Sequence, residues 1–171
     1  MKKLLIVVDY QKDFVDGALG FPGAETLAEK IQAKIEAYRQ AGDEVVFTLD
    51  THREDYLQTQ EGRNLPVPHC LEGSEGWELY PPLKALPGEK VFRKPAFGSA
   101  ELFDHLRGER YESIEIVGLV SSICVISNAV LAKTAQPETL IVIPSDCTAG
   151  FDKELHDAAL KVMAGLQMQV I

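Results

Sequence analysis

The sequence predicts an α/β fold: a three-layer αβα, Rossmann-like sandwich around a mainly parallel six-stranded sheet. Short apolar runs of strand length alternate with segments whose apolar residues recur at helical spacing, which is typical of strands joined by crossover helices. With 171 residues, the chain suits one domain, residues 1–171, whose core needs no disulfide. Polar residues follow several of the strands, at the edge where such sheets bind ligands.

The first half of the chain begins this alternation. Residues 4–8 form a continuous apolar run, typical of a strand covered on both faces. Apolar side chains at helical spacing in residues 27–38, followed by Gly42, predict the first crossover helix. A second strand is expected at residues 44–49. The polar, Gly- and Pro-rich residues 53–82 are long for a connection, so they are either functional or loosely ordered.

The second half continues the pattern up to the end of the chain. Further strands are expected at residues 89–92, 114–117, 139–143 and 168–171, with helices at residues 100–106, 121–133 and 155–163.

Residues 114–128 carry the most informative pattern. Gly118 is expected to end a buried strand, and Ser121 and Ser122 can cap the helix that follows, which places Cys124 in its first turn. Free N–H groups and the helix dipole there would stabilise a thiolate and a nearby oxyanion. The alternative is that Cys124 is a small buried apolar residue.

Composition narrows the function classes. Apolar residues make up 46% and charged ones 25%, and the net charge of −9 argues against binding nucleic acid or an anionic membrane. A small or weakly charged substrate fits better. Asp9 interrupts the first apolar run too early for a signal peptide, and no run reaches membrane-spanning length. Three cysteines without C-x-x-C spacing predict neither disulfides nor a zinc ribbon, and favour a reducing cytoplasm.

Asp9, Lys94 and Cys124 each follow or lie near a predicted strand end. Together they make a possible nucleophile system in which Lys94 favours the thiolate and Asp9 carries the proton to a leaving amine. Backbone N–H groups near Ser121 to Cys124 would hold the oxyanion. The alternative is a structural ion pair of Asp9 and Lys94 above an inert thiol.

A second set of residues suits a metal ion. Asp50 and His52 lie two apart at a strand end, and His69 can complete a two-His, one-carboxylate set. Glu61 is a candidate fourth ligand. Such a set leaves open positions and suits Zn, Fe or Mn, although the D-x-H pattern by itself is common on surfaces.

Five segments in order give the chain a resemblance to a family. They are D-Y-Q-K-D-F at residues 9–14, D-T-H at 50–52, P-H-C and E-G-S-E-G within 68–76, K-P-A-F at 94–97, and G-L-V-S-S-I-C-V at 118–125. With them the chain resembles the isochorismatase-like cysteine hydrolases, and within these the nicotinamidases, over nearly its whole length.

The resemblance implies a triad of Asp9, Lys94 and Cys124 and an oxyanion hole at Val120, Ser121 and Cys124, shaped by a cis peptide between Val120 and Ser121. It also implies a divalent metal, most simply zinc, at Asp50, His52 and His69, which in nicotinamidases holds the pyridine nitrogen. Members acting on isochorismate or carbamoyl compounds generally lack the metal set. Members often form dimers or tetramers, so a homo-oligomer is expected.

The chain also departs from the nicotinamidases. They commonly carry Trp-Pro just ahead of the metal histidine, whereas residues 65–68 here read L-P-V-P, and Lys12 stands where Asn is frequent. Phe14 and Phe97 are the expected flanks of a flat substrate.

The sequence therefore predicts a metal-containing cysteine amidase acting on nicotinamide or a similar small aromatic amide. The alternatives are a hydrolase of another C–N bond, such as an N-carbamoyl compound, and a non-catalytic metal- or partner-binding domain with a redox-sensitive Cys124. Cys70, Cys147 and Trp77 are expected to pack, and His156 on the last helix to face solvent.

Overall fold

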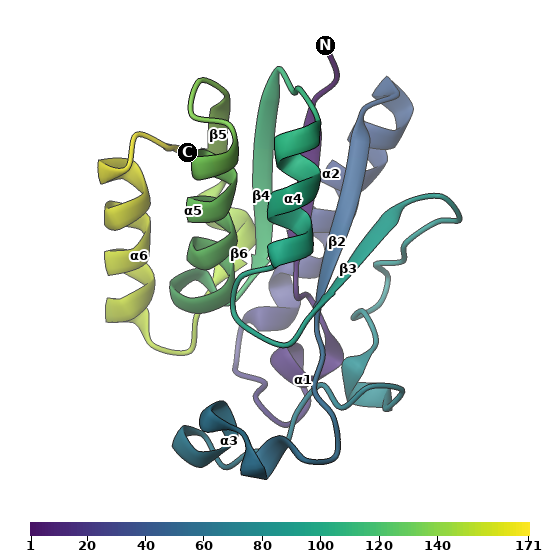
Figure 1. Cartoon of the computed structure of the whole chain (residues 1–171), viewed down its shortest axis with the longest axis vertical. Helices are drawn as coiled ribbons and strands as arrows, with labels where there is room; N and C mark the ends of the chain where they lie inside the picture. Colours follow the sequence, from purple (N-terminus) through teal and green to yellow (C-terminus); the bar gives the residue numbers. More distant parts are fainter.

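The computed structural model describes residues 1–171 and is built on a parallel seven-stranded sheet, whose strands stand side by side in Figure 1. The strands are β1 (Leu4–Val8), β2 (Glu44–Asp50), β3 (Lys90–Lys94), β4 (Ser113–Leu119), β5 (Leu140–Ile143), β6 (Thr148–Ala149) and β7 (Gln169–Val170). Their order is β3-β2-β1-β4-β5-β7, with β6 beside β4. The predicted α/β fold is confirmed, and the sheet gains a seventh strand because β6 adds two residues next to β4.

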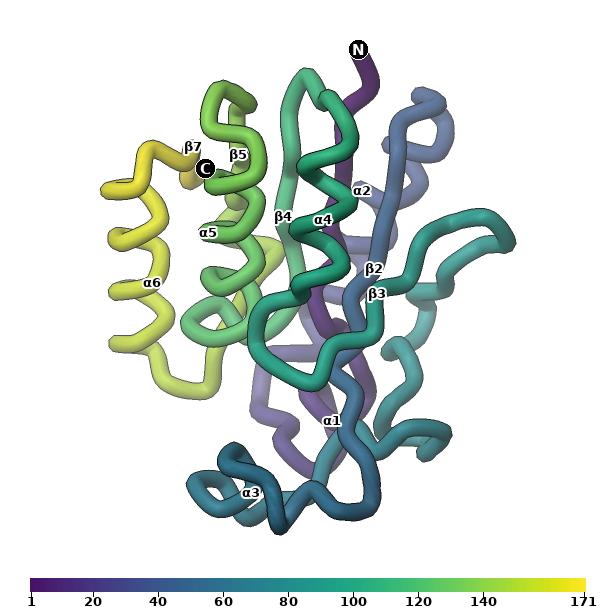
Figure 2. Tube along the Cα trace, in the orientation of Figure 1, coloured from purple at the N-terminus to yellow at the C-terminus, as the bar shows by residue number.

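Helices cover both faces of the sheet. They are α1 (Lys12–Val15), α2 (Ala28–Ala41), α3 (Gln60–Asn64), α4 (Ala100–Gly108), α5 (Ile126–Ala135) and α6 (Lys153–Gly165), with a π-helical turn, η4 (Ser121–Val125), ahead of α5. In Figures 1 and 2, α4, α5 and α6 lie on the near side of the sheet and α2 lies behind it. None of these helices combines the length and apolar character needed to cross a membrane.

The alternation of side chains along β1 divides the core into two layers. Leu4, Ile6 and Val8 pack with residues of α4, α5 and α6, whereas Leu5 and Val7 pack with residues of α2. All five are fully buried, as expected for a central parallel strand. This packing is the three-layer arrangement predicted from the sequence.

Gly118 lies inside β4, so the prediction that it ends the strand is wrong. Its φ is +116°, and a Cβ atom there would lie 2.0 Å from the backbone oxygen of Val8. Only glycine allows β4 to run this close to β1 and to continue to Leu119. The turn that carries Cys124 therefore starts directly at the edge of the sheet.

The long segment after β2 is ordered and folds back over the carboxyl edge of the sheet. It contains α3 and two short 3-10 turns, and His52 forms a bridge with Leu71. Trp77 packs in this segment, as expected: its indole N–H donates to Thr51 Oγ1 at 2.9 Å, and the Arg93 guanidinium lies 4.9 Å from its ring centre. Of the two alternatives for this segment, the structure favours a functional loop.

Candidate active site

Four neighbouring strands bring the predicted chemistry to one edge of the sheet. Asp50 and Lys94 are the last residues of β2 and β3, Asp9 follows β1, and Cys124 lies in the turn after β4. Because all four strands are parallel, their carboxyl ends meet at the same edge. All four side chains are buried there.

Asp9 is held by backbone conformation and by two polar contacts. Its φ of 45° lies in the left-handed region, which Asp tolerates better than most residues. The Thr48 hydroxyl donates to Asp9 Oδ1 at 2.6 Å, and Lys94 Nζ lies 2.5 Å from Asp9 Oδ2. The carboxylate is thus fixed at the mouth of β1 with its second oxygen on the lysine.

Lys94 connects the carboxylate to the sulfur. Besides Asp9, its ammonium group lies 3.4 Å from Cys124 Sγ, donates to the Ala96 carbonyl at 3.0 Å and lies 3.6 Å from Asp50 Oδ1. The three residues expected to act together are therefore in one contact chain. The contacts show that the three distant segments meet at one place. A nucleophile, a cation that stabilises its anion and a proton carrier need the same arrangement.

The surroundings of the Cys124 sulfur raise its pKa. Burial raises the pKa of Cys124, the Asp9 carboxylate raises it further, and the Lys94 ammonium only partly opposes them, so the pKa is well above its ordinary value. This shift favours the thiol form over the thiolate that the helix dipole and Lys94 were expected to stabilise. Burial also raises the pKa of Asp9 against the effect of Lys94, which suits this carboxylate to accept a proton during a reaction.

The turn that carries Cys124 starts differently from the prediction. Its first five residues form a π-helical turn with Val120 at the cap position, and no serine side chain caps it. The Val120 carbonyl accepts the N–H groups of Ile123 and Val125, while the N–H of Val120 itself donates to no acceptor in the chain. The non-proline cis peptide joins Leu119 to Val120, one residue before the predicted position.

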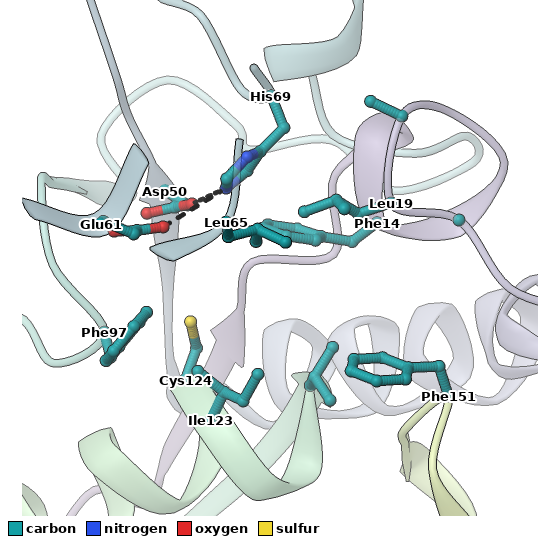
Figure 3. Close-up of a pocket in the computed structure, with 13 residues that line it drawn as sticks. Phe14, Leu19, Asp50, Glu61, Leu65, His69, Phe97, Ile123, Cys124 and Phe151 are labelled. Carbon is teal, nitrogen blue, oxygen red and sulfur yellow. Dashed lines mark ion pairs between the residues drawn. The ribbon is translucent and has the colours of Figure 1, made fainter. Parts of the chain in front are cut away.

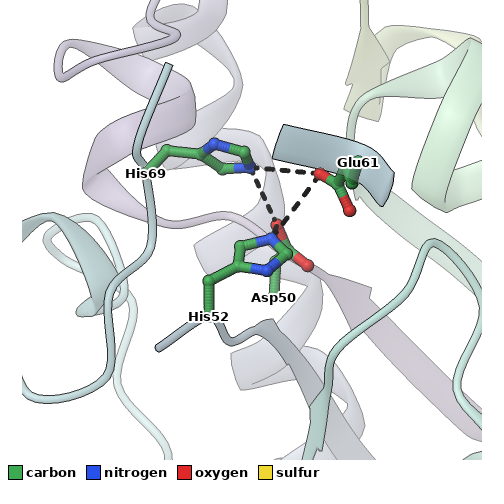
Figure 4. A group of neighbouring side chains, drawn as sticks. All are labelled: Asp50, His52, Glu61 and His69. Carbon is green, nitrogen blue, oxygen red and sulfur yellow. Dashed lines mark hydrogen bonds and ion pairs between the residues drawn. The ribbon is translucent and has the colours of Figure 1, made fainter. Parts of the chain in front are cut away.

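Figure 4 shows a compact set of four side chains, Asp50, His52, Glu61 and His69, with one ligand atom from each all within 4.8 Å of one another. The set adjoins the triad through the contact of Asp50 with Lys94. Nε2 of His52 and of His69 lie 3.0 Å and 3.3 Å from Asp50 Oδ2, and 3.6 Å and 3.7 Å from Glu61 Oε1. Glu61, the candidate fourth ligand, thus lies in the same group.

This set fits a divalent metal ion. His69 Nδ1 donates to the Val67 carbonyl at 2.8 Å, so in the neutral ring Nε2 keeps its lone pair toward the set. Burial opposes ionisation of Asp50, but the neighbouring histidines and Lys94 lower its pKa below the ordinary range. Its Oδ1 is buried without a hydrogen-bond partner, an orphan that a cation can satisfy.

Two residues that the sequence analysis did not single out hold these ligands. The Gln11 side chain donates to the Asp50 carbonyl at 2.9 Å and accepts the Asp50 N–H at 2.8 Å. Asp13 accepts the N–H of Cys70 at 2.7 Å, directly after His69. Both residues lie in the 9–14 segment. In the sequence, a polar side chain close to a strand end is the feature by which their role could have been predicted.

Cys124 of the triad and three residues of the metal set, Asp50, Glu61 and His69, line one cavity of about 390 Å³ (Figure 3). Phe14 and Phe97 both line it, as expected. The remaining apolar wall was not predicted and consists of Ala18, Leu19, Gly20, Leu65, Val120, Ile123 and Phe151. Cys124, Asp50, Glu61 and His69 supply its polar side, so a flat apolar ligand with one polar edge fits the lining.

The structure also shows the surroundings of two further cysteines, an asparagine and a histidine. Cys70 and Cys147 are fully buried, as expected. Asn128 was missed: its amide donates to the carbonyls of Cys124 at 2.8 Å and Phe97 at 3.1 Å, tying the cysteine turn to the loop after Lys94. His156 does not simply face solvent, because its Nδ1 lies 2.8 Å from Ser121 Oγ.

Comparison with known proteins agrees with this geometry. The Isochorismatase domain model matches residues 3–171. The chain belongs to the isochorismatase family. Within this family it falls in the nicotinamidase-like branch: nicotinamidase/pyrazinamidase PncA from Bacillus subtilis is 33% identical over 99% of both chains, with a TM-score of 0.87.

Two further solved members show the range of the family. The pyrazinamidase of Pyrococcus horikoshii, in complex with zinc, is 26% identical over 100% of this chain and 99% of its own, with a TM-score of 0.87. The N-carbamoylsarcosine amidase from Thermoplasma acidophilum is 26% identical over 99% and 95%, with a TM-score of 0.81. This isochorismatase-family hydrolase therefore shares its fold both with a pyrazinamidase and with an N-carbamoylsarcosine amidase.

Proposed function

We propose that this isochorismatase-family chain is a metal-containing cysteine amidase, and that it hydrolyses nicotinamide or a similar small aromatic carboxamide to the carboxylate and ammonia. The observation that carries the proposal is the contact chain from Asp9 through Lys94 to Cys124, which opens on the same cavity as the metal set. Similarity to the nicotinamidase/pyrazinamidase of Bacillus subtilis supports the choice of substrate.

The proposed reaction starts with proton transfer. Asp9 takes the thiol proton as the sulfur of Cys124 attacks the amide carbon, and the carbonyl π electrons move to the oxygen. Backbone N–H groups of Val120, Ser121 and Cys124 hold this oxyanion. Burial opposes the charge on Lys94, but Asp9 and its other acidic neighbours together raise the pKa of Lys94, so this group serves as the ammonium beside the sulfur.

The second half of the proposed reaction releases both products. Asp9 returns the proton to the amide nitrogen, the C–N bond breaks, and ammonia leaves behind a thioester on Cys124. Asp9 then takes a proton from water as the hydroxide adds to the thioester carbon. When the carbonyl re-forms and the C–S bond breaks, Asp9 returns this proton to the sulfur, which leaves as a thiol, and the carboxylic acid product loses its own proton to solvent.

Asp50, His52 and His69, with Glu61, would hold the metal. Zinc suits this nitrogen and carboxylate set, and the zinc complex of the Pyrococcus horikoshii pyrazinamidase supports it; Fe and Mn also suit such ligands. When bound, the ion supplies a Lewis-acid contact for an electron-pair donor such as a ring nitrogen. Phe14 and Phe97, both on the cavity wall, would flank the ring.

The runner-up is hydrolysis of another C–N bond, such as that of an N-carbamoyl compound. The similarity to the Thermoplasma acidophilum amidase supports it, and so does Leu65, which lines the cavity in the segment where nicotinamidases commonly carry tryptophan. Ammonia release measured over a panel of carboxamides and N-carbamoyl compounds separates the two.

The deciding experiment is ammonia release from nicotinamide by the protein loaded with zinc. We expect turnover that is lost in Cys124→Ala and on chelation, and that returns when zinc is restored. Mass spectrometry of acid-quenched protein should show the acyl group on the peptide that contains Cys124. Turnover of an N-carbamoyl compound with none on nicotinamide would establish the runner-up, and turnover by Cys124→Ala would refute the thioester route.

A further inference from the structure

A partly buried hydrogen bond links α6 to the turn that carries Cys124. His156 Nδ1 lies 2.8 Å from Ser121 Oγ. Ser121 is fully buried, and its hydroxyl has no other partner in the chain. Because a buried hydroxyl is costly to leave unpaired, this single contact fixes the orientation of Ser121.

The surroundings of this hydrogen bond leave little room for an alternative arrangement. Gly150 packs against the pair so closely that a Cβ atom there would lie 3.2 Å from Ser121 Oγ and 3.7 Å from His156 Cβ. His156 itself lies in the first turn of α6, where its N–H donates to the Asp152 carbonyl at 2.9 Å and the Asp152 side chain caps the helix. The imidazole is therefore held at a defined place by its own helix.

Ser121 stands where a small displacement affects the reacting groups. It follows Val120, whose N–H has no acceptor in the chain. It is also the first residue of the turn that contains Cys124 and ends at Val125. Both Val120 and Cys124 line the cavity. Moving Ser121 therefore moves the peptide units on each side of it relative to the sulfur.

We propose that His156 is a positioning residue for amide hydrolysis: by holding Ser121, it holds the N–H groups at the start of the cysteine turn where the developing oxyanion needs them. The inference rests on the proposed hydrolysis at Cys124. Oxyanion donors act at about 2.7–3.1 Å from the oxygen, and a misplacement of about 1 Å can reduce the rate about 100-fold.

Three variants test the role. In His156→Ala we expect kcat to fall about 10- to 100-fold while KM changes less than about threefold, because groups that bind the ring are untouched. His156→Asn should recover most of the loss, since the Asn amide can place a polar atom near the position of Nδ1. Leu155→Ala, an exposed neighbour on the same helix, is the matched control and should keep both constants.

A second readout separates positioning from a general loss of stability. The aldehyde matching the hydrolysed carboxamide binds by adding its carbon to the Cys124 sulfur, while the carbonyl π bond opens and the thiol proton passes to the oxygen, which then sits at the oxyanion position. In His156→Ala, affinity for the aldehyde should fall by the same factor as kcat/KM, whereas affinity for the carboxylate product should stay within about twofold.

The outcomes distinguish this inference from the proposed function. A protein that hydrolyses no member of the panel refutes the proposed function, and the inference with it. If the protein is active and folded His156→Ala keeps its kcat and aldehyde affinity while only its melting temperature drops, His156 is a structural residue and the inference is wrong. If Ser121→Ala with His156→Ala is no worse than either single variant, the effect passes through Ser121.

Discussion

Replacing Asp9 with Asn should make Cys124 react faster with alkylating reagents and at the same time greatly reduce turnover. The side chain keeps its shape and its contact with Thr48, but it loses the negative charge that opposes Lys94 at the sulfur. The Lys94 ammonium then acts on the sulfur with less compensation, and the pKa of Cys124 should fall. The proton acceptor of the proposed reaction disappears in the same step.

The magnitude follows from the 3.4 Å between Lys94 Nζ and Cys124 Sγ. Two unit charges at that distance interact by about 5 kcal/mol at an effective dielectric of about 20. In the unsubstituted chain the Asp9 charge offsets much of this attraction. If the substitution releases a third of it, about 1.6 kcal/mol, the thiolate population at fixed pH rises more than about tenfold. Loss of the proton acceptor should lower kcat about 10²- to 10⁴-fold.

The assay compares alkylation by iodoacetamide at pH 7 with ammonia release, on protein shown to be folded by circular dichroism. That control is necessary because Lys94 loses its nearest charged partner and keeps Asp50, with Oδ1 at 3.6 Å, as its remaining carboxylate neighbour, which can cost up to about 3–5 kcal/mol of stability. Asp146→Asn, which removes an exposed carboxylate at another strand end, should leave both rates unchanged. Slower alkylation, or turnover near that of the unsubstituted chain, would refute the reasoning.

Two further predictions concern stability. Gly118→Ala should destabilise the protein by roughly 3–5 kcal/mol, because its Cβ would overlap a β1 carbonyl at a positive φ; Gly108→Ala, which meets no atom within 4 Å, should change stability by less than about 1 kcal/mol in urea melts. Glu89→Gln should cost about 1 kcal/mol at pH 7. Burial opposes ionisation of Glu89, but the Arg39 guanidinium favours it, and the net effect is a lowered pKa in the folded protein. The contribution of Glu89 to stability is therefore fully present above about pH 4.3, the pKa of an unfolded Glu, and is lost as the pH falls through the lower pKa of the folded state. A cost that stays constant down to pH 3 would contradict this assignment.

Much of the site's location was predictable because it depends on local patterns. The apolar run before Asp9 and the run before Asp50 each predict a buried strand, and each places its carboxylate at the carboxyl end. Parallel strands bring those ends together whatever the details of packing. The same logic brought the Cys124 turn to the shared edge.

The errors arose where a neighbouring strand or helix decides the outcome. Gly118 reads as a strand terminator, yet it allows β4 to approach β1 within a distance no other residue permits. Similarly, His156 reads as a polar residue of an amphipathic helix, and only the packing of α6 against the cysteine turn gives it Ser121 as a partner.

The sequence by itself determined the strands, the helices between them and the set of acid, base, thiol and imidazole groups that follow the strands, because these depend on residue type and short-range periodicity. Only the tertiary structure decided that burial and Asp9 raise the pKa of Cys124, that Asn128 joins its turn to the Lys94 loop, and that Glu61 lies within reach of Asp50 and the two histidines. The physical reason is that desolvation and charge interactions depend on which groups come within a few ångströms of one another. That proximity is set by the whole fold and not by any one segment.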